Sequence, residues 1–99
     1  MMRVLKWELP LDEGMVEIPL SRGATILGVA GVGGKPCLYT IESSKADPEK
    51  VARKFHIAYT GIPFDGRWDT HRFLGTLEII LRSGQLIVLH VFEVNPSKA

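Results

Sequence analysis

The chain contains 99 residues, of which 45% are apolar and 23% are charged. This length and composition are typical of one folded domain and exclude an intrinsically disordered chain. The 12 Lys and Arg residues nearly balance 11 Asp and Glu residues, and the resulting net charge of +1 argues against a dedicated nucleic-acid-binding protein.

Cysteine content and hydropathy predict a cytoplasmic protein without membrane association. Cys37 is the only cysteine, so no internal disulfide can form and nothing indicates secretion. Residues Met1–Pro10 lack the apolar segment of a signal peptide. The longest apolar stretches, Ile79–Leu81 and Leu86–Leu89, are far too short to span a bilayer. We expect Cys37 to be a small buried apolar side chain.

Alternation of apolar and polar residues predicts two strands at the start of the chain. Arg3–Leu9 alternates with Trp7 on the core face. Met15–Leu20 alternates again after a turn, and Pro19 predicts that this strand lies at a sheet edge, because proline donates no ladder hydrogen bond.

A glycine-rich hairpin is the clearest unit of the next segment. Ala24–Val32 is apolar on both faces, which predicts a central strand, and its glycines Gly28 and Gly31 indicate a bulge or a close backbone approach. Gly33–Pro36 reads as the hairpin loop, and Cys37–Glu42 as the returning strand.

Three further strands are predicted after a segment without strand character. Ser43–Lys50 has helix-capping residues and predicts at most two helical turns. Ala52–Thr60 alternates, and Thr70–Leu81 is strand-like, with Phe73 expected inward beside its other apolar residues. Gln85–Val94 is apolar on both faces and therefore reads as a central strand.

About seven strands at this spacing predict a mainly β protein. We expect a small antiparallel β-sandwich or partly open barrel with at most one short helix. Residues 1–94 form the single β domain of this prediction, and residues 95–99 a flexible C-terminal tail.

No arrangement of residues indicates catalysis or a bound metal. The candidate ligands do not show a metal-binding spacing, and Cys37 has no partner histidine that the sequence can place beside it. We therefore expect no catalytic residue, no metal and no cofactor. The candidate ligands weighed are Cys37, His56, Asp65, Asp69, His71 and His90.

The segment from Gly61 to Arg72 is the best candidate for a binding site. It contains a loop that is long for so small a chain, and long loops tend to be functional. Aromatic and arginine side chains together are typical of a protein-binding hot spot, or of a pocket that stacks a base and pairs phosphates. A structural alternative is an aromatic lid over the core. The candidate binding residues are Phe64, Asp65, Arg67, Trp68, Asp69, His71 and Arg72, with Lys35 as a further phosphate contact.

Short blocks along nearly the whole chain form a further pattern. They are Ile18–Leu20, Gly23–Ala24 with Ile26, Leu27 and Val29, Lys35–Tyr39, Phe55 and Ile57 leading to Thr60, Gly61 and Pro63, Phe73–Thr76, and Leu89–Glu93. In these blocks the chain resembles a family of small tailed-bacteriophage and prophage proteins without established chemistry, and the last three blocks are the most specific. The resemblance departs in the loop after Pro63, and at Tyr39, where tryptophan is expected.

This resemblance implies a phage accessory protein in the bacterial host cytoplasm. The first hypothesis is a non-enzymatic inhibitor that binds a host protein, which includes proteins of host defence. The second is an oligomeric sponge for a small nucleotide signal, in which a homo-oligomer forms pockets between subunits. The third is a structural or assembly module. Neutral charge favours a host protein over nucleic acid as the partner.

Overall fold

A computed structural model describes residues 1–12, 14–43, 45, 49–64 and 70–94 of the chain. These residues form seven strands and no helix. The predicted strands are all present, and their bounds differ from the predicted ones by one or two residues. The strands are β1 (Met2–Glu8), β2 (Gly14–Ser21), β3 (Thr25–Val32), β4 (Lys35–Ser43), β5 (Lys50–Tyr59), β6 (His71–Ile80) and β7 (Leu86–Val94).

Two predicted features fall largely on positions that the structure does not describe. Most of the segment in which a short helix was expected, residues 44 and 46–48, lies outside the described residues. The predicted tail, residues 95–99, also lies outside them. Within the described residues, no helix is long and apolar enough to cross a membrane.

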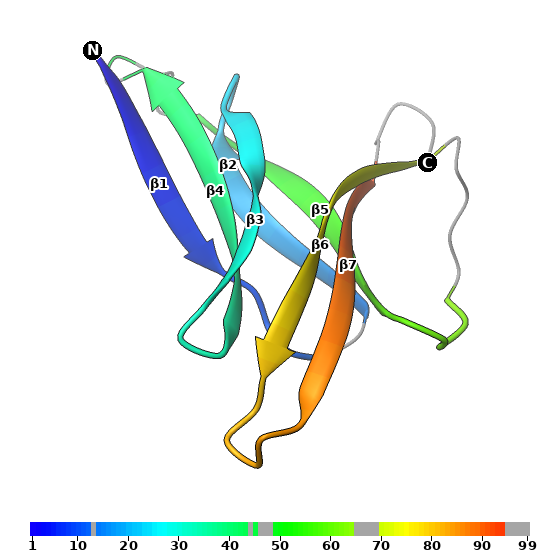
Figure 1. The fold of residues 1–99 in the computed structure, drawn as a ribbon. Helices are drawn as coiled ribbons and strands as arrows, with labels where there is room; N and C mark the ends of the chain where they lie inside the picture. Colours follow the sequence, from blue (N-terminus) through cyan, green and yellow to red (C-terminus); the bar gives the residue numbers. More distant parts are fainter. Residues whose placement is uncertain (13, 44, 46–48, 65–69, 95–99) are drawn as a thin grey trace.

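The strands form two antiparallel sheets that pack as a sandwich, as the sequence predicts (Figure 1). One sheet has the order β1-β4-β3 and the other the order β2-β5-β7-β6. The strand that contains Pro19 lies at an edge, and β7 lies between two neighbours, so both of these predictions are confirmed.

The central position predicted for β3 is wrong, because β3 is an edge strand of the three-stranded sheet. The face of β3 that carries Val29 and Gly31 lies against β6 of the opposite sheet, whereas Leu27 and Val32 remain 55% and 40% exposed. Glycines permit this close approach. A Cβ atom on Gly31 would lie 2.8 Å from Ile79 Cδ1, and one on Gly75 would lie 2.7 Å from Val29 Cγ2. The expected bulge of β3 is present between Ile26 and Gly28.

One hydrophobic core fills the space between the sheets. Leu38 of β4, Phe55 of β5, and Leu89 and Val91 of β7 are fully buried within it. Trp7 packs against this core, as its alternation predicts. Each buried side chain adds about 1.5–3 kcal/mol to the hydrophobic driving force for folding.

Phe73 does not face this core, contrary to the prediction. The register of β6 against β7 shifts between Phe73 and Gly75, which marks a β-bulge. The extra residue reverses the alternation, so Phe73 lies on the face opposite to Leu77 and is half exposed. A regular period of two cannot predict this reversal.

Only two of the connections between successive strands are hairpins, β3–β4 and β6–β7. Gly33 and Gly34 form the first as a two-residue turn with φ of 58° and 77°, a conformation that favours glycine. β5 and β6 are not paired, because β7 lies between them. β5 ends opposite Leu89 of β7 and β6 begins opposite Val94, so β5 and β6 run parallel and need a longer connection than a hairpin.

Candidate functional site

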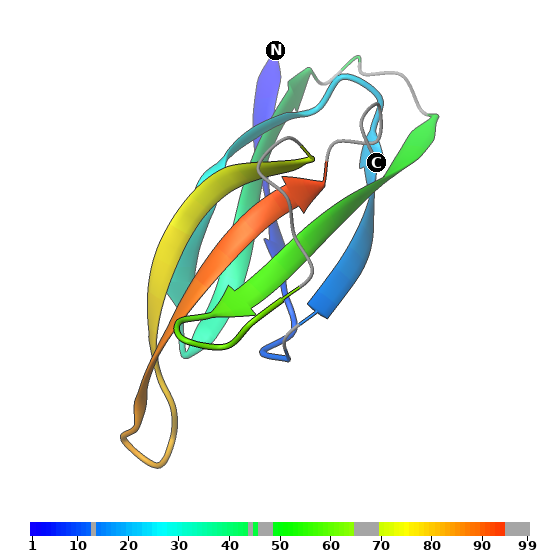
Figure 2. The same cartoon turned by 90° about the vertical axis from the view of Figure 1, so that its right-hand side faces the viewer.

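The outer face of the four-stranded sheet is turned toward the viewer in Figure 2. The strand register places several aromatic and histidine side chains on this face, pointing away from the core. Strand register places His56 of β5, Phe92 of β7 and Phe73 of β6 in one row across this sheet. Ala58, His90 and Thr76 form the next row, and His71 lies opposite Val94. We call this surface the histidine face. It comprises His56, Ala58, Phe64, His71, Phe73, Thr76, His90 and Phe92.

Phe64 covers the first row from above. Its ring centroid lies 4.8 Å from that of His56, in an edge-to-face arrangement, and 5.6 Å from that of Phe92. The Phe73 ring lies 5.6 Å from the Phe92 ring on the other side. Such offset aromatic contacts favour a defined arrangement of the rings. The segment after β5 is therefore anchored on the sheet by an aromatic cluster.

Two histidines meet over β7. His56 Nδ1 and His71 Nε2 are 3.2 Å apart, although the residues come from strands that are not neighbours. The Thr70 hydroxyl lies 2.9 Å from His71 Nδ1 and orients the ring. Both imidazoles are thus held by contacts at defined nitrogens.

The third histidine is held separately. His90 Nε2 lies 2.7 Å from the Thr60 hydroxyl, and its Nδ1 lies 3.0 Å from the Thr76 hydroxyl. Threonine hydroxyls both donate and accept, so either neutral tautomer of His90 is satisfied.

A shallow cavity of about 450 Å³, largely open to solvent, lies beside this cluster. Its size lies in the range of small-ligand and side-chain pockets. Among the described residues that line the cavity, Thr60 and His90 offer polar side-chain groups, and none is a Lys, Arg, Asp or Glu. The lining residues are Ala58, Tyr59, Thr60, Gly61, Ile62, Pro63, Phe64, His90 and Phe92.

The structure brings together only some of the residues predicted for the site. Phe64 and His71 both lie on the histidine face, where their rings are 6.3 Å apart. Arg72 lies opposite Glu93 in the register and so faces the other side of the sheet. The predicted Asp65, Arg67, Trp68 and Asp69 lie outside the described residues.

Lys35 is not part of this site, contrary to the prediction. It begins β4 in the other sheet, where its Nζ lies 3.5 Å from a Glu8 carboxylate oxygen. The buried position expected of Cys37 is confirmed. Cys37 is buried in β4, whereas both histidines point outward from the opposite sheet.

Phe64 is also no lid over the core between the sheets. It contacts His56 and Phe92 on the outer face of its sheet and remains about two-fifths exposed (41%). Phe64 therefore covers part of the outer surface of the sheet, and it does not form the lid over the core that we considered for this loop.

Sequence reasoning missed Phe92, Phe73, Thr60 and Thr76 as members of the site. A signal for Phe92 was present, because β7 is apolar on both faces. An apolar outward row indicates that something covers the outer face of the strand. Phe73 was missed because of the bulge, and the threonines because their role depends on the position of His90.

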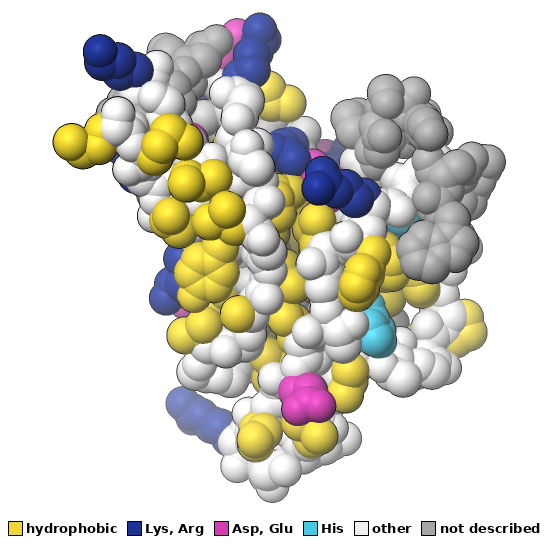
Figure 3. Space-filling view, turned by 45° about the horizontal axis from the view of Figure 1, so that its top comes forward, with side chains coloured by type: hydrophobic (Ala, Val, Ile, Leu, Met, Phe, Trp, Pro, Cys, Tyr) yellow, Lys and Arg dark blue, Asp and Glu magenta, His cyan; other side chains and the backbone are white. Residues whose placement is uncertain are grey.

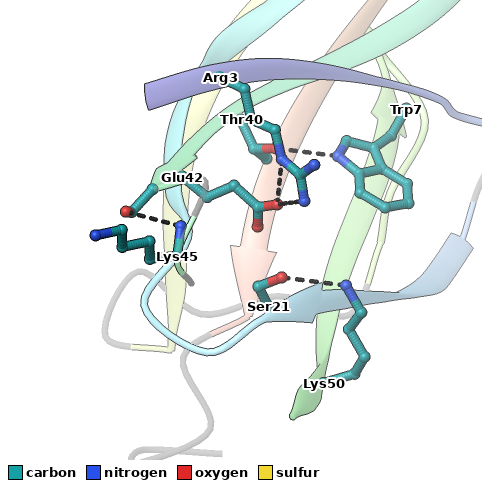
Figure 4. A network of polar contacts seen from close by, with 8 residues as sticks. Arg3, Trp7, Ser21, Thr40, Glu42, Lys45 and Lys50 are labelled. Atoms are coloured by element: carbon teal, nitrogen blue, oxygen red, sulfur yellow. Dashed lines mark hydrogen bonds and ion pairs between the residues drawn. The ribbon is translucent and has the colours of Figure 1, made fainter. Parts of the chain in front are cut away.

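A second polar cluster lies between the sheets at the end where β2 ends and β5 begins (Figure 4). The Arg3 guanidinium donates to Glu42, with Nη2–Oε1 and Nε–Oε1 distances of 2.7 and 3.0 Å. The Lys50 ammonium donates to the Ser21 hydroxyl at 3.1 Å. A hydrogen bond from Ser21 and then the bond from Arg3 hold the pKa of the buried Glu42 carboxyl below its ordinary value, although burial raises it.

A similar pair lies close by in the four-stranded sheet. Arg53 Nε and Nη2 donate to the two carboxylate oxygens of Glu93 at 2.6 and 2.9 Å, and Nη1 donates to the Ala24 carbonyl at 2.7 Å. Arg53 thereby links the start of β3 to the other sheet. Within the described residues, no buried side-chain nitrogen or oxygen lacks a hydrogen-bond partner. Because these groups satisfy one another, this cluster serves to join the sheets, and the histidine face is the better candidate site.

Comparison with known proteins identifies a family. The family model for the domain of unknown function DUF7352 matches residues 1–99, so the chain belongs to this family. No curated protein and no solved structure matches the chain.

Proposed function

We propose that this member of the DUF7352 family is a non-enzymatic protein-binding module, whose histidine face docks a partner protein. The observation that carries the proposal is the cavity of about 450 Å³ next to uncovered aromatic rings. Half-exposed aromatic side chains around a pocket are typical of binding hot spots. Phe73 and Ile62 are 50% and 48% exposed on this side of the sheet.

The lining defines the chemistry of the occupant. The walls offered by Ile62, Pro63, Phe64 and Phe92 are apolar, and Thr60 with His90 provides a polar group at one side. A large apolar or aromatic side chain with a neutral polar tip fits this combination, since such groups bury apolar area and keep one hydrogen bond. We infer a partner that inserts such a side chain into the cavity.

The biological setting follows from the resemblance to phage accessory proteins. That resemblance supports a protein of the bacterial host, in its cytoplasm, as the partner, and inhibition of that protein as the consequence of binding. A defence protein is one such target. The proposed partner and its inhibition rest on this resemblance and do not depend on the cavity.

The nucleotide alternative has less support from the described residues. A nucleotide needs cations for its phosphates, yet none of the described cavity-lining residues is Lys or Arg. Of the three residues expected to meet phosphates, Lys35 and Arg72 lie elsewhere, and Arg67 lies outside the described residues. The structural or assembly role and the homo-oligomer stay predictions.

A matched pair of surface variants tests the protein-binding proposal. Ile62→Glu places a charge at the cavity, and Val4→Glu places the same charge on the outer face of the other sheet, where Val4 is 56% exposed. The partner is first captured from a bacterial lysate with the wild-type protein and identified. Its affinity for purified wild type and both variants is then measured by calorimetry.

We expect Ile62→Glu to weaken binding by at least about tenfold, and Val4→Glu to leave it within about twofold, because hot spots dominate binding. Phe64→Ala should weaken binding to a similar extent. Unchanged affinity for both Ile62→Glu and Phe64→Ala would contradict the proposal. A larger loss of affinity in Val4→Glu than in Ile62→Glu would indicate that the partner binds the three-stranded sheet instead. In Figure 3, hydrophobic side chains are also visible on that side of the molecule.

A further inference from the structure

The outer face of the three-stranded sheet carries apolar side chains, where an antiparallel sheet with one face on the core usually carries polar ones. Trp7 and Leu38 lie opposite each other and belong to the core side of β1 and β4. Side chains alternate along a strand, so the opposed pair Val4 and Ile41 points outward. Hydrophobic side chains gather on this side of the molecule (Figure 3).

Strand β3 extends this apolar surface. Ile26 packs against the core, so Leu27 beside it points outward and is half exposed. Val32 near the other end of the strand also remains exposed. We call this surface the apolar sheet face. Its apolar members are Met2 and Val4 of β1, Leu27 and Val32 of β3, and Tyr39 and Ile41 of β4.

Charge is distributed unevenly across the apolar sheet face. Strand β1 contributes Lys6 and Glu8, whereas the outward residues of β3 are uncharged. At the start of β4, Lys35 Nζ lies 3.5 Å from a Glu8 carboxylate oxygen, which neutralises it. One edge strand of the face is therefore charged and the other apolar.

This asymmetry makes the face complementary to a copy of itself. A twofold axis along β4 lays β1 of each copy over β3 of the other, so the charged strands do not meet. Lys6 lies opposite Tyr39 on one side of β4, and the bulge that contains Leu27 lies opposite Tyr39 on the other side. The alkyl chain of Lys6 would thus cover Leu27 of the second copy, and its ammonium would stay in water.

The area of the face agrees with a reversible dimer. Strands of seven to nine residues that lie about 4.8 Å apart, with a rise of about 3.3 Å per residue, give a flat area on the order of 400 Å². With the relief of the side chains included, two copies bury on the order of 1,000 Å² in total, which is the lower end for a specific interface. Sheet faces of this kind pack with their strands aligned within about 30°.

We propose that two copies of this chain form a symmetric dimer through the apolar sheet face, with β1 of each copy over β3 of the other. The histidine face lies on the opposite side of the sandwich and stays uncovered. The dimer therefore presents two histidine faces that point away from each other. This proposal goes beyond the protein-binding proposal and does not depend on it.

Two leucines of similar exposure provide a matched test. Leu27 is 55% exposed on the apolar sheet face, and Leu86 is 52% exposed at the start of β7 in the other sheet. Leu27→Lys places a second cation against Lys6 of the other copy, whereas Leu27→Glu places a carboxylate there. Leu86→Lys introduces the same cation away from the proposed interface.

Sedimentation velocity of untagged wild type and variants, from about 1 μM to about 1 mM chain, measures the dissociation constant. We expect a monomer–dimer equilibrium in the wild type. Leu27→Lys should raise the dissociation constant by at least about tenfold and Leu27→Glu by less, because like charges that face each other oppose association. Leu86→Lys should stay within about twofold of wild type, as substitutions outside an interface do.

The variant Val4→Glu separates the two proposals. Val4 lies on the apolar sheet face, so its replacement by glutamate should weaken the dimer. The affinity of each chain for the captured partner protein should nevertheless stay unchanged, because the histidine face is intact. Loss of the dimer with partner binding retained supports both proposals, and a dimer that persists in Val4→Glu contradicts only this one.

Dilution of the wild-type protein, followed by nuclear magnetic resonance, locates the interface without any variant. The amide resonances of Val4, Leu27 and Ile41 should move on dilution, and that of Leu86 should not. Changes confined to the histidine face would overturn the proposal, because the copies would then meet there.

Three results from sedimentation would also overturn the proposed dimer. The first is a wild-type protein that stays monomeric up to about 1 mM. The second is a trimer or larger assembly, since a twofold contact closes at two copies. The third is equal weakening by Leu27→Lys and Leu86→Lys. Equal weakening by Leu27→Lys and Leu27→Glu would contradict the placement of β1 over β3.

Discussion

At the scale of single residues, Glu42 shows how a charge is accommodated between the sheets. Its side chain is only 3% exposed, yet it accepts hydrogen bonds from Ser21 and Arg3 and lies near Lys50. A buried carboxylate is tolerated only when it is paired and hydrogen-bonded in this way. The contacts favour the ionised form of Glu42 in the folded protein.

Glu42 should make the stability of the fold sensitive to acid. Its folded pKa lies below the ordinary value of 4.5, so the folded state binds this proton less readily than the unfolded state. The stabilisation is complete above about pH 4.5 and is lost as the pH falls through the lower folded pKa. We expect Glu42→Gln to lower the thermal midpoint at pH 7, and the difference from wild type to shrink below pH 4.5.

An exposed carboxylate serves as the control for this measurement. Glu17 is 59% exposed in its side chain and lies 3.9 Å from Lys54, a separation at which surface pairs contribute little. Glu17→Gln should change the midpoint only slightly at either pH. A Glu42→Gln difference that stays constant from pH 7 to pH 3 would argue against a lowered pKa at Glu42.

At the scale of elements, two glycines set how closely β3 approaches β6. Gly31 faces Ile79, and Gly75 faces Val29. These glycines do not have positive φ, so their role is space and not backbone freedom. The missing side chains let strands of different sheets pack without a ladder of hydrogen bonds between them.

Gly31→Ala should therefore destabilise the fold by overpacking. Its Cβ would lie 2.8 Å from Ile79 Cδ1 and 3.1 Å from the Glu78 carbonyl oxygen, and one of these neighbours must move. We expect a loss of about 1–3 kcal/mol in the free energy of unfolding, measured by urea denaturation.

Ile79→Val removes the Cδ1 atom that clashes and so provides a rescue. The double variant Gly31→Ala with Ile79→Val should lose less stability than the sum of the two single variants. The rescue should be partial, because the Glu78 carbonyl contact remains. Strict additivity of the two losses would show that Gly31→Ala acts through some other contact.

The positions of the strands were easier to predict than the direction in which their side chains point. The sequence predicted all seven strands, since alternation and glycine-rich turns are local signals. It predicted the wrong face for Phe73 because the bulge next to Gly75 depends on pairing with β7. It also placed β3 at the centre of a sheet, because apolar residues on both faces suggested burial on both sides, whereas Leu27 and Val32 of this edge strand remain exposed.

At the scale of the whole molecule, one core joins both sheets. Leu38 comes from the three-stranded sheet, and Leu89 and Phe55 come from the four-stranded sheet, yet all three belong to one buried cluster. A chain of 99 residues buries too little surface to stabilise either sheet alone. The polar links from Arg53 to Ala24 and from Ser21 to Glu42 add further contacts between the sheets.

We therefore expect the two sheets to unfold in one cooperative transition. Urea denaturation followed by amide resonances of Leu38 and Leu89 should give the same midpoint and slope for both. Separate midpoints would mean that one sheet survives without the other, and that the shared core contributes less than its burial suggests.

The sequence by itself determined the mainly β class, the number of strands, the edge position of β2 and the central position of β7. These features depend on residue type and on neighbours within a few positions, so local patterns carry them. The sequence also identified the segment that contributes Phe64 and His71 to the histidine face, because length and aromatic content are visible in the chain.

Only the tertiary structure decided which distant residues meet at the site. His56 and His71 come from strands separated by β7, and His90 reaches Thr60 and Thr76 from two other segments. The same pairing excluded Lys35 and turned Arg72 to the other face. Strand order and register are set by the global balance of core packing, and a one-residue change of register moves every side chain to the opposite face of its sheet.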